Sequence, residues 1–275
     1  MEPLFILPFD HRANFAVGLL KSEYPASKKI AAQVKSLKKI VFEGFLEART
    51  KYKGTGATGV LIDEEFGSAI IAQAQKKGIP VAVSTEKSGQ KLFQFEHETN
   101  WKEVLKSLRP TFAKTLVRYD IAQKKENLEQ NKRLKHLSDF CEEEGIDLMM
   151  EVLMTGGGSR EKEMAVMMQE MQRIGIRPTV WKVEGLDSST AWKRIRKVTQ
   201  IPIIVLGRAG SKKEVDAWLI AAAKSKVVQG FAVGRSIFEK PLQDFLAGKI
   251  DREATVKKIA QNYLGFIKAY EKAST

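Results

Sequence analysis

The segment "DLMMEVLMTGGGSREKEMAVMMQEMQRIGIRPTVWKVE", residues 147–184, holds one complete repeat of the pattern that decides the fold. It begins with a short apolar run (147–154), continues with an amphipathic stretch (161–175) and ends with a second apolar run (178–184). Short, nearly continuous apolar runs are typical of strands buried on both faces, and a helix between two of them makes the strands parallel. The segment therefore predicts a strand–helix–strand unit of a parallel sheet.

The same pattern recurs along the rest of the chain. The other strand candidates are 4–10, 58–63, 80–85, 111–119, 201–207 and 227–234. Three glycines stand where the intervening helices would end: Gly78, Gly145 and Gly175. Eight strand–helix units in about 250 residues are typical of a single (β/α)8, or TIM, barrel, and their regularity favours a closed sheet over an open doubly wound one. Because no linker or composition break interrupts the pattern, we expect one domain over residues 1–275.

The composition bounds the partners and the location. The sequence is 43% hydrophobic and 29% charged, and no apolar stretch approaches the roughly 18 residues of a membrane helix. The net charge of +13 is spread along the helices rather than gathered with exposed aromatic residues, which does not favour nucleic-acid binding. The single cysteine, Cys141, excludes an internal disulfide and fits a cytoplasmic location. The sequence is compatible with a homo-oligomer as well as with a monomer.

Charged side chains interrupt the apolar runs near the carboxyl ends of the strands, where barrel enzymes carry their chemistry. Side chains alternate between the faces of a strand, so Lys182 shares a face with Val180, opposite Trp181 and Val183. The bulk of the latter pair suits the helix layer, which places Lys182 inside the barrel. The same alternation places two more residues inside: Lys114 and Glu151. Further charged residues follow or end strands, and of these Asp10 is a catalytic candidate and three are expected to contact substrate: Arg12, Asp63 and Glu184.

Two lysines and a carboxylate inside one barrel have a specific chemical use. A buried lysine is rarely tolerated without a partner or a task. Desolvation and a second nearby cation both favour the neutral amine, which is the nucleophile of Schiff-base enzymes. A carboxylate can then move protons while the iminium accepts the electrons of a breaking carbon–carbon bond. The alternative is an internal ion-pair network without catalysis.

The histidines give no support for a metal-dependent reaction. Only His11, His97 and His136 are present, and they lack the spacing of metal ligands. We therefore expect neither a metal ion nor an organic cofactor. The alternative is a magnesium ion bound by the carboxylates of Asp10, Asp63 and Glu65.

The loops after the last two strands predict an anion site. Barrels often bind phosphate with these loops and with the N-terminus of a short helix. The expected phosphate ligands are Gly207, Arg208, Ala209, Gly210, Gly234 and Arg235. The loop "TGGGS" (155–159) is a second anion nest, a lid or a plain connector.

The sequence resembles the class I tagatose-1,6-bisphosphate aldolase family. It is similar, more closely still, to the aldolase-like domain that follows the sugar kinase in 5-dehydro-2-deoxygluconokinases of inositol catabolism. Six motifs carry the resemblance, in order along nearly the whole chain: "PFDHR" (8–12), "LIDEEFG" (61–67), "AKTLVRYD" (113–120), "MMEVLM" (149–154), "VWKVEGL" (180–186) and "FAVGRSIFEKPL" (231–242). The resemblance implies that Lys182 forms the Schiff base, that Glu151 is the acid and base, and that Lys114 favours the neutral amine or contacts substrate. Asp10 would bind substrate hydroxyls or assist proton transfer.

The implied reaction is cleavage of a phosphorylated keto-sugar or keto-acid to dihydroxyacetone phosphate (DHAP) and an aldehyde. The closer resemblance favours 2-deoxy-5-keto-gluconate 6-phosphate, with malonate semialdehyde as the aldehyde. Three positions that flank the substrate depart from the tagatose enzymes: His11 replaces glutamine, Ala13 replaces glycine, and Arg208 replaces a smaller residue. The alternatives are tagatose or fructose bisphosphate, a sulfonated sugar phosphate, or a barrel that binds sugar phosphates without catalysis.

Overall fold

The computed structural model describes residues 2–208 and 210–275. The strands are β1 (Leu4–Pro8), β2 (Ala57–Ile62), β3 (Val81–Ser84), β4 (Phe112–Tyr119), β5 (Asp147–Met154), β6 (Val180–Glu184), β7 (Ile203–Leu206) and β8 (Gly230–Ala232). The helices are η1 (Asn14–Leu19), α1 (Lys28–Lys51), α2 (Glu64–Lys76), α3 (Trp101–Leu108), α4 (Lys124–Glu144), α5 (Arg160–Arg173), α6 (Ser189–Arg196), α7 (Lys212–Ser225), α8 (Arg235–Leu246) and α9 (Arg252–Ser274).

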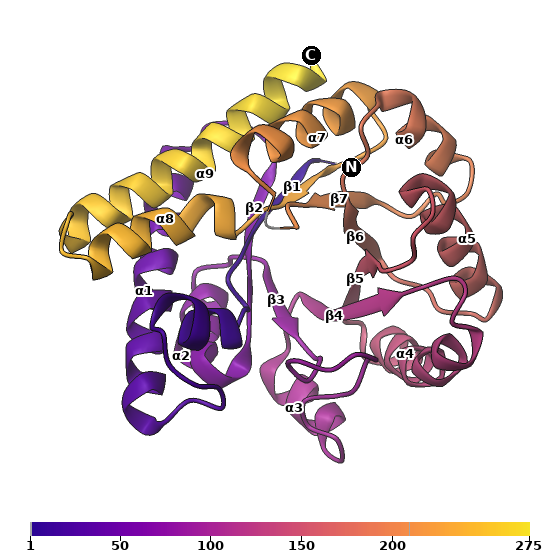
Figure 1. Ribbon diagram of the computed structural model, residues 1–275, viewed down its shortest axis with the longest axis horizontal. Coiled ribbons are helices and arrows are strands. Elements are labelled where there is room, and N and C mark those ends of the chain that lie inside the picture. Colours follow the sequence, from indigo (N-terminus) through magenta and orange to yellow (C-terminus); the bar gives the residue numbers. More distant parts are fainter. Residues whose placement is uncertain (1, 209) are drawn as a thin grey trace.

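The eight strands close into a parallel barrel in sequence order, because β8 pairs with β1 as well as with β7. Figure 1 shows the strands in the centre and the helices around them. The predicted (β/α)8 barrel is therefore confirmed. The three glycines predicted at helix ends take left-handed φ angles of 62°, 66° and 81°, as helix ends in glycine commonly do: Gly78, Gly145 and Gly175.

The alternation of side chains along the strands produces two apolar layers. The inner layer fills the barrel with Ile6, Leu61, Ala82, Met149, Val180, Ile204 and Ala232. The outer layer lies between strands and helices and contains Trp181 and Val183, both almost fully buried. Burial of each such side chain contributes roughly 1.5–3 kcal/mol to stability. The predicted faces of β6 are therefore confirmed, and Lys182 belongs to the inner face.

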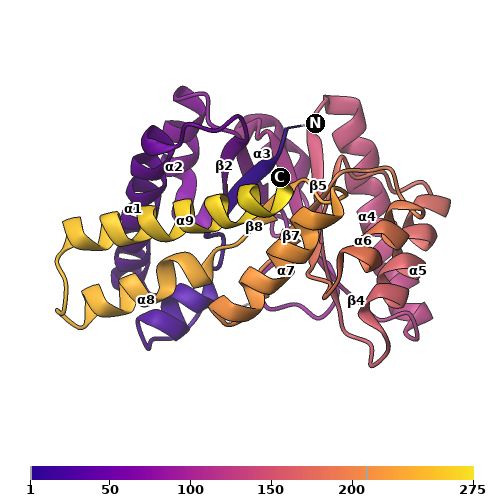
Figure 2. The same ribbon diagram turned by 90° about the horizontal axis from the view of Figure 1, so that it is seen from above.

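The last helix covers the seam at which the barrel closes. α9 packs against α1, α7 and α8, across which it runs in Figure 2. The hydroxyl of Tyr263 donates to the Phe5 carbonyl at 2.7 Å, and that of Tyr270 donates to the Val228 carbonyl at 2.6 Å. These bonds attach α9 to β1 and to the segment before β8.

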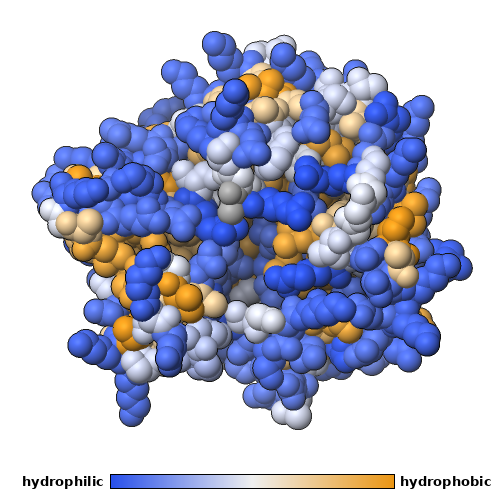
Figure 3. Space-filling view, in the orientation of Figure 1, coloured by the Kyte–Doolittle hydropathy of each residue, from blue (hydrophilic) through white to orange (hydrophobic). Residues whose placement is uncertain are grey.

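The surface seen in Figure 3 is mostly hydrophilic, and its hydrophobic residues lie in small separate groups. In the described part of the chain, no helix combines the length and the apolar character needed to cross a membrane.

Candidate active site

A cavity of about 400 Å³ opens at the carboxyl ends of the strands. Its floor comes from the inner faces of β4, β5 and β6, and its walls come from the loops after β1, β3, β7 and β8. Most of the predicted site residues line this cavity. They are Asp10, Arg12, Lys114, Glu151, Lys182, Gly207, Arg208, Gly234 and Arg235. The structure thus brings together most of the set, although its members are up to 225 positions apart in the sequence, from Asp10 to Arg235.

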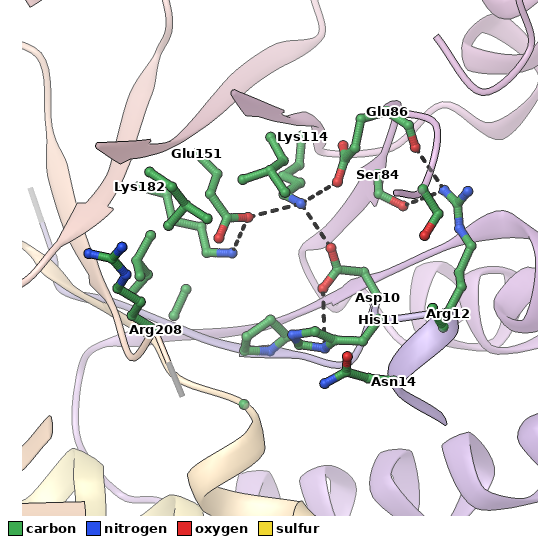
Figure 4. Close-up of a pocket in the computed structure, with 18 of the residues that line it drawn as sticks. Asp10, His11, Arg12, Asn14, Ser84, Glu86, Lys114, Glu151, Lys182 and Arg208 are labelled. Atoms are coloured by element: carbon green, nitrogen blue, oxygen red, sulfur yellow. Dashed lines mark hydrogen bonds and ion pairs between the residues drawn. The ribbon is translucent and has the colours of Figure 1, made fainter. Parts of the chain in front are cut away.

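Lysines and carboxylates form a continuous network on the cavity floor (Figure 4). Lys182 Nζ lies 2.6 Å from Glu151 Oε2, and Lys114 Nζ lies 2.9 Å from the same oxygen. Lys114 also contacts Asp10 at 2.9 Å and Glu86 at 2.5 Å. Because Glu151 and Lys182 are Cα partners across β5 and β6, their contact follows directly from the strand register.

Mutual attraction fixes the charges of this network. Burial alone would lower the pKa of Lys114, but its three carboxylate partners raise it well above its ordinary value. Burial also opposes the charge of Glu151, yet Lys114 and Lys182 outweigh it and lower the pKa of this carboxyl. The pKa of Asp10 likewise stays well below its usual range, mainly because of Lys114. Lys114 is therefore a cation between ionised Asp10 and Glu151 at neutral pH.

Glu86 differs from the other two carboxylates. Burial raises its pKa, and the attraction of Lys114 does not offset this effect. Its Oε2 atom is buried and has no hydrogen-bond partner among the described residues. Of the three carboxyls around Lys114, Glu86 is therefore the easiest to protonate.

His11 lies against this network as a neutral ring. Its Nδ1 atom is 3.9 Å from Asp10 Oδ1. Burial lowers the pKa of His11 to about 4 although Asp10 acts in the opposite direction, and Arg235 and Lys182 add to the lowering. The imidazole is thus uncharged at neutral pH and presents polar nitrogens to the cavity without adding a cation.

Replacing His11 with glutamine should flatten the dependence of stability on acidic pH. Between pH 6.5 and the folded-state pKa of about 4, the unfolded state binds more protons at His11 than the folded state. The stabilising contribution is therefore complete above pH 6.5 and is lost as the pH falls towards 4. Urea unfolding at pH 7.5 and pH 5 should show a loss about 1–2 kcal/mol larger for the wild type than for His11→Gln.

The matched control is His136→Gln, since His136 is exposed on α4. It should keep the full wild-type loss between the two pH values. A His11→Gln protein that loses as much stability as the wild type would contradict the assignment of a partly buried, neutral imidazole.

The cavity wall after β8 is suited to an anion. α8 begins at Arg235, and the free N–H groups of a helix N-terminus attract negative charge. A Cβ atom at Gly234 would lie only 2.1 Å from the Pro8 carbonyl oxygen, so only glycine permits this close approach of the helix start to β1. Arg235 and Ser236 line the cavity beside it.

Arg208, after β7, is positioned by Glu184. The Arg208 guanidinium forms an ion pair with Glu184, which is almost fully buried and also accepts a 2.7 Å hydrogen bond from the Met154 N–H. Arg208 has a φ of 41°, an uncommon left-handed conformation for a residue with a side chain. The loop thus directs a guanidinium to the cavity at a cost in backbone conformation.

Three residues expected to contact substrate or phosphate do not line the cavity. Asp63 is fully buried, where it forms an ion pair with Lys38 and caps α2 by accepting from Phe66 N at 2.9 Å. Glu184 lies behind Arg208, and Gly210 bonds to Gly207 O at 2.8 Å. Ala209, also expected to bind phosphate, lies outside the described residues.

The loop 155–159 wraps around a carboxylate of its own chain. Gly158 N donates to Glu163 Oε1 at 2.9 Å, and Glu163 is almost fully buried. None of the five residues of the loop lines the cavity. The Gly158 N–H, which could have served a second anion site, is therefore directed at Glu163 instead.

Glu86 and Arg118 line the cavity but were not predicted from the sequence as residues of the site. Glu86 stands two residues after the end of β3, so the rule that singled out Asp10 could also have found it. Arg118 lies on β4 four residues beyond Lys114 and therefore on the same face. His11, which the resemblance placed beside the substrate, also lines the cavity.

The structure gives no group of metal ligands in its described part. Across residues 2–208 and 210–275, no three histidine, cysteine, aspartate or glutamate side chains are arranged to hold a metal ion. Of the carboxylates considered for magnesium, Asp63 is taken up by Lys38, and Glu65 accepts a 2.9 Å hydrogen bond from the Tyr24 hydroxyl. Two of the three carboxylates considered for magnesium are therefore engaged by other side chains of the protein.

The fold is shared with solved structures of distant sequence. Cgl0159 from Corynebacterium glutamicum is 17% identical, with a TM-score of 0.64 over 96% of this chain and 86% of that one. An archaeal fructose 1,6-bisphosphate aldolase is 13% identical, with a TM-score of 0.60 over 96% of this chain and 94% of that one. The YdjI aldolase from Escherichia coli K12 is 13% identical, with a TM-score of 0.59 over 98% of this chain and 91% of that one.

At such identities the likeness concerns the fold alone. A search of curated proteins found no match to the sequence. One family model, described as "Uncharacterized protein conserved in bacteria (DUF2090)", matches residues 1–274, nearly the whole sequence. The chain therefore belongs to the DUF2090 family.

Proposed function

We propose that the protein is a class I aldolase in which Lys182 forms a Schiff base with a keto substrate. The observation that carries this proposal is the position of Lys182 Nζ inside the cavity, 2.6 Å from Glu151 Oε2 and beside Lys114. A buried amine, a proton carrier and a second cation are the groups that such a reaction needs. The similarity of fold to two barrels described as aldolases agrees with it.

The reaction begins with the amine of Lys182. In its neutral form it attacks the keto carbon, and loss of water from the carbinolamine leaves an iminium ion. Glu151 then takes the proton of the hydroxyl on the β-carbon, and the bond between the α- and β-carbons breaks. The electron pair of this bond moves into the iminium to give an enamine, while the β-carbon leaves as an aldehyde. Protonation of the enamine carbon and hydrolysis release the ketone product and restore the amine.

Lys114 and Asp10 support this sequence. Lys114 remains a cation, as its raised pKa requires, so it can hold Glu151 ionised and donate to a substrate oxygen. Asp10 Oδ2 accepts from Lys114 at 2.9 Å, which aims the Asp10 carboxylate at the same part of the cavity. A substrate hydroxyl there would meet one donor and one acceptor.

The substrate class follows from the cationic wall after β7 and β8. Arg208, Arg235 and the N-terminus of α8 are suited to a phosphate on the ketone half of the substrate. The resemblance in sequence makes 2-deoxy-5-keto-gluconate 6-phosphate the preferred substrate, cleaved to DHAP and malonate semialdehyde. The keto group of this substrate lies next to the carbon that carries the phosphate. Arg208 and Arg235 can therefore bind the phosphate while Lys182 reaches the keto carbon.

Borohydride trapping tests the proposal directly. The protein is incubated with DHAP, reduced with borohydride and digested, and the modified peptide is located by mass spectrometry. We expect a stable adduct on Lys182 and no loss of aldol cleavage when EDTA is added. DHAP binding without an adduct would favour the non-catalytic barrel, and an activity that EDTA abolishes would refute the lysine mechanism.

A further inference from the structure

Arg118 lies on the inner face of β4, with Lys114 and Leu116, and lines the cavity. The pairing of β4 with β5 shows how far Arg118 lies along the barrel towards its mouth. Leu116 pairs with Glu151, and Arg118 pairs with Leu153, two residues farther along β5. Two residues of a strand span about 7 Å, so Arg118 stands one layer closer to the mouth than Glu151 and Lys182.

The Arg118 guanidinium has an unused positive charge. Its Nη1 atom donates to the Gln90 carbonyl at 3.0 Å. In the described part of the chain, no carboxylate lies within ion-pair distance of Arg118, whereas Arg12, Arg208 and Lys114 are each paired with glutamate. A partly buried guanidinium without a carboxylate is a favourable partner for an oxyanion.

Arg235 is the other guanidinium of the cavity with no carboxylate at ion-pair distance among the described residues. It follows β8, which stands opposite β4 in a barrel of eight strands. Between the two arginines lie Glu151 on β5 and Lys182 on β6. The cavity therefore has a cationic group on each side of its reactive centre.

We propose that Arg118 binds an oxyanion, carboxylate or phosphate, on the aldehyde half of the substrate and so selects substrates that are charged at both ends. This inference rests on the proposed function. A substrate with its phosphate near β7 and β8 and its keto carbon at Lys182 extends past Glu151 towards β4. The end that leaves as the aldehyde then comes to Arg118, one layer above the site of bond cleavage.

A purely structural role for Arg118 would be to hold the loop after β3 through Gln90. Arg133 offers a matched comparison because its Nη1 atom donates to the Phe93 carbonyl of the same loop at 3.1 Å. Arg133 does not line the cavity. Arg133→Gln therefore removes a loop bond, together with the exposed ion pair of Arg133 with Glu129, but no charge from the cavity. Arg118→Gln removes a loop bond together with a charge of the cavity.

The experiment measures aldol addition of DHAP to three aldehydes: malonate semialdehyde, glyceraldehyde 3-phosphate and neutral propanal. For Arg118→Gln we expect kcat/KM to fall about 10- to 100-fold with at least one anionic aldehyde and to stay within about threefold with propanal. Arg118→Lys should restore part of the loss, and Arg133→Gln should leave the ratio of anionic to neutral aldehyde unchanged. A larger fall in kcat/KM with malonate semialdehyde would identify a carboxylate as the ligand of Arg118. A larger fall with glyceraldehyde 3-phosphate would identify a phosphate.

Two results would overturn the inference: an equal fall with all three aldehydes, which indicates a loop effect, or no fall at all. Binding of malonate, measured by calorimetry, needs no turnover and should weaken at least tenfold in Arg118→Gln but not in Arg133→Gln. Unchanged malonate binding would also count against it. Failure of the wild type to form the borohydride adduct refutes the proposed function, whereas an adduct with unaltered aldehyde preference refutes only the role of Arg118.

Discussion

Lys182→Met should abolish aldol cleavage and the borohydride adduct while leaving the barrel folded. Methionine has nearly the length of the lysine side chain and no nucleophile, so neither the carbinolamine nor the iminium can form. Removal of a covalent nucleophile typically costs about 10⁴-fold or more in kcat. Cleavage of the keto-acid phosphate, followed as DHAP release, should therefore fall to the background rate.

The fold should survive because the partner of Lys182 keeps another cation. Breaking a buried ion pair is costly when it leaves a charge without a partner. Glu151 Oε2 still has Lys114 Nζ at 2.9 Å, so the change in unfolding free energy should stay within about 2 kcal/mol. Thermal unfolding and circular dichroism check this point.

Lys87→Met is the matched control for the loss of a cavity lysine. Lys87 also lines the cavity, but its side chain is 40% exposed and its Nζ atom pairs with Glu98 at 2.8 Å on the surface. This variant should keep the adduct on Lys182 and most of the activity. A Lys182→Met protein that retains turnover, or an adduct that moves to Lys87, would refute the assignment of the nucleophile.

The inner position of Lys182 could be predicted from sequence because strand alternation is a local property. Trp181 and Val183 require the helix layer, so Lys182 must point the other way. The same local rule placed Lys114 and Glu151 correctly on inner faces. Closure of the barrel also followed from local patterns, since eight similar units can bury their apolar strands together.

The partner of each charge could not be predicted in this way. Asp63 follows β2 as a site residue would, but α1 brings Lys38 beneath the barrel mouth and withdraws Asp63 into a fully buried pair. Glu184 lies on the same face as Lys182, yet Arg208 and the Met154 N–H occupy its oxygens. Such pairings depend on how helices and loops dock on the barrel, which strand periodicity does not encode.

Glu151→Gln should separate proton transfer from Schiff-base formation. The amide keeps the shape of the carboxylate but cannot accept the hydroxyl proton, so kcat for cleavage should fall about 10²- to 10⁴-fold. Formation of the borohydride adduct with DHAP should persist, because the nucleophile remains in place. The measurement compares kcat with the yield of adduct on Lys182 in the same protein sample.

Glu86→Gln is the sharpest comparison for this variant, because both changes remove one carboxylate from Lys114. Glu86 contacts Lys114 at 2.5 Å, but of the two carboxylates only Glu151 also reaches Lys182, at 2.6 Å. If the carboxylates act only by balancing the charge of Lys114, the two variants should lose similar activity. If Glu151 carries the proton, Glu86→Gln should stay within about tenfold of the wild type, well above Glu151→Gln. Equal losses in both variants would assign Glu151 to the ion-pair network rather than to catalysis.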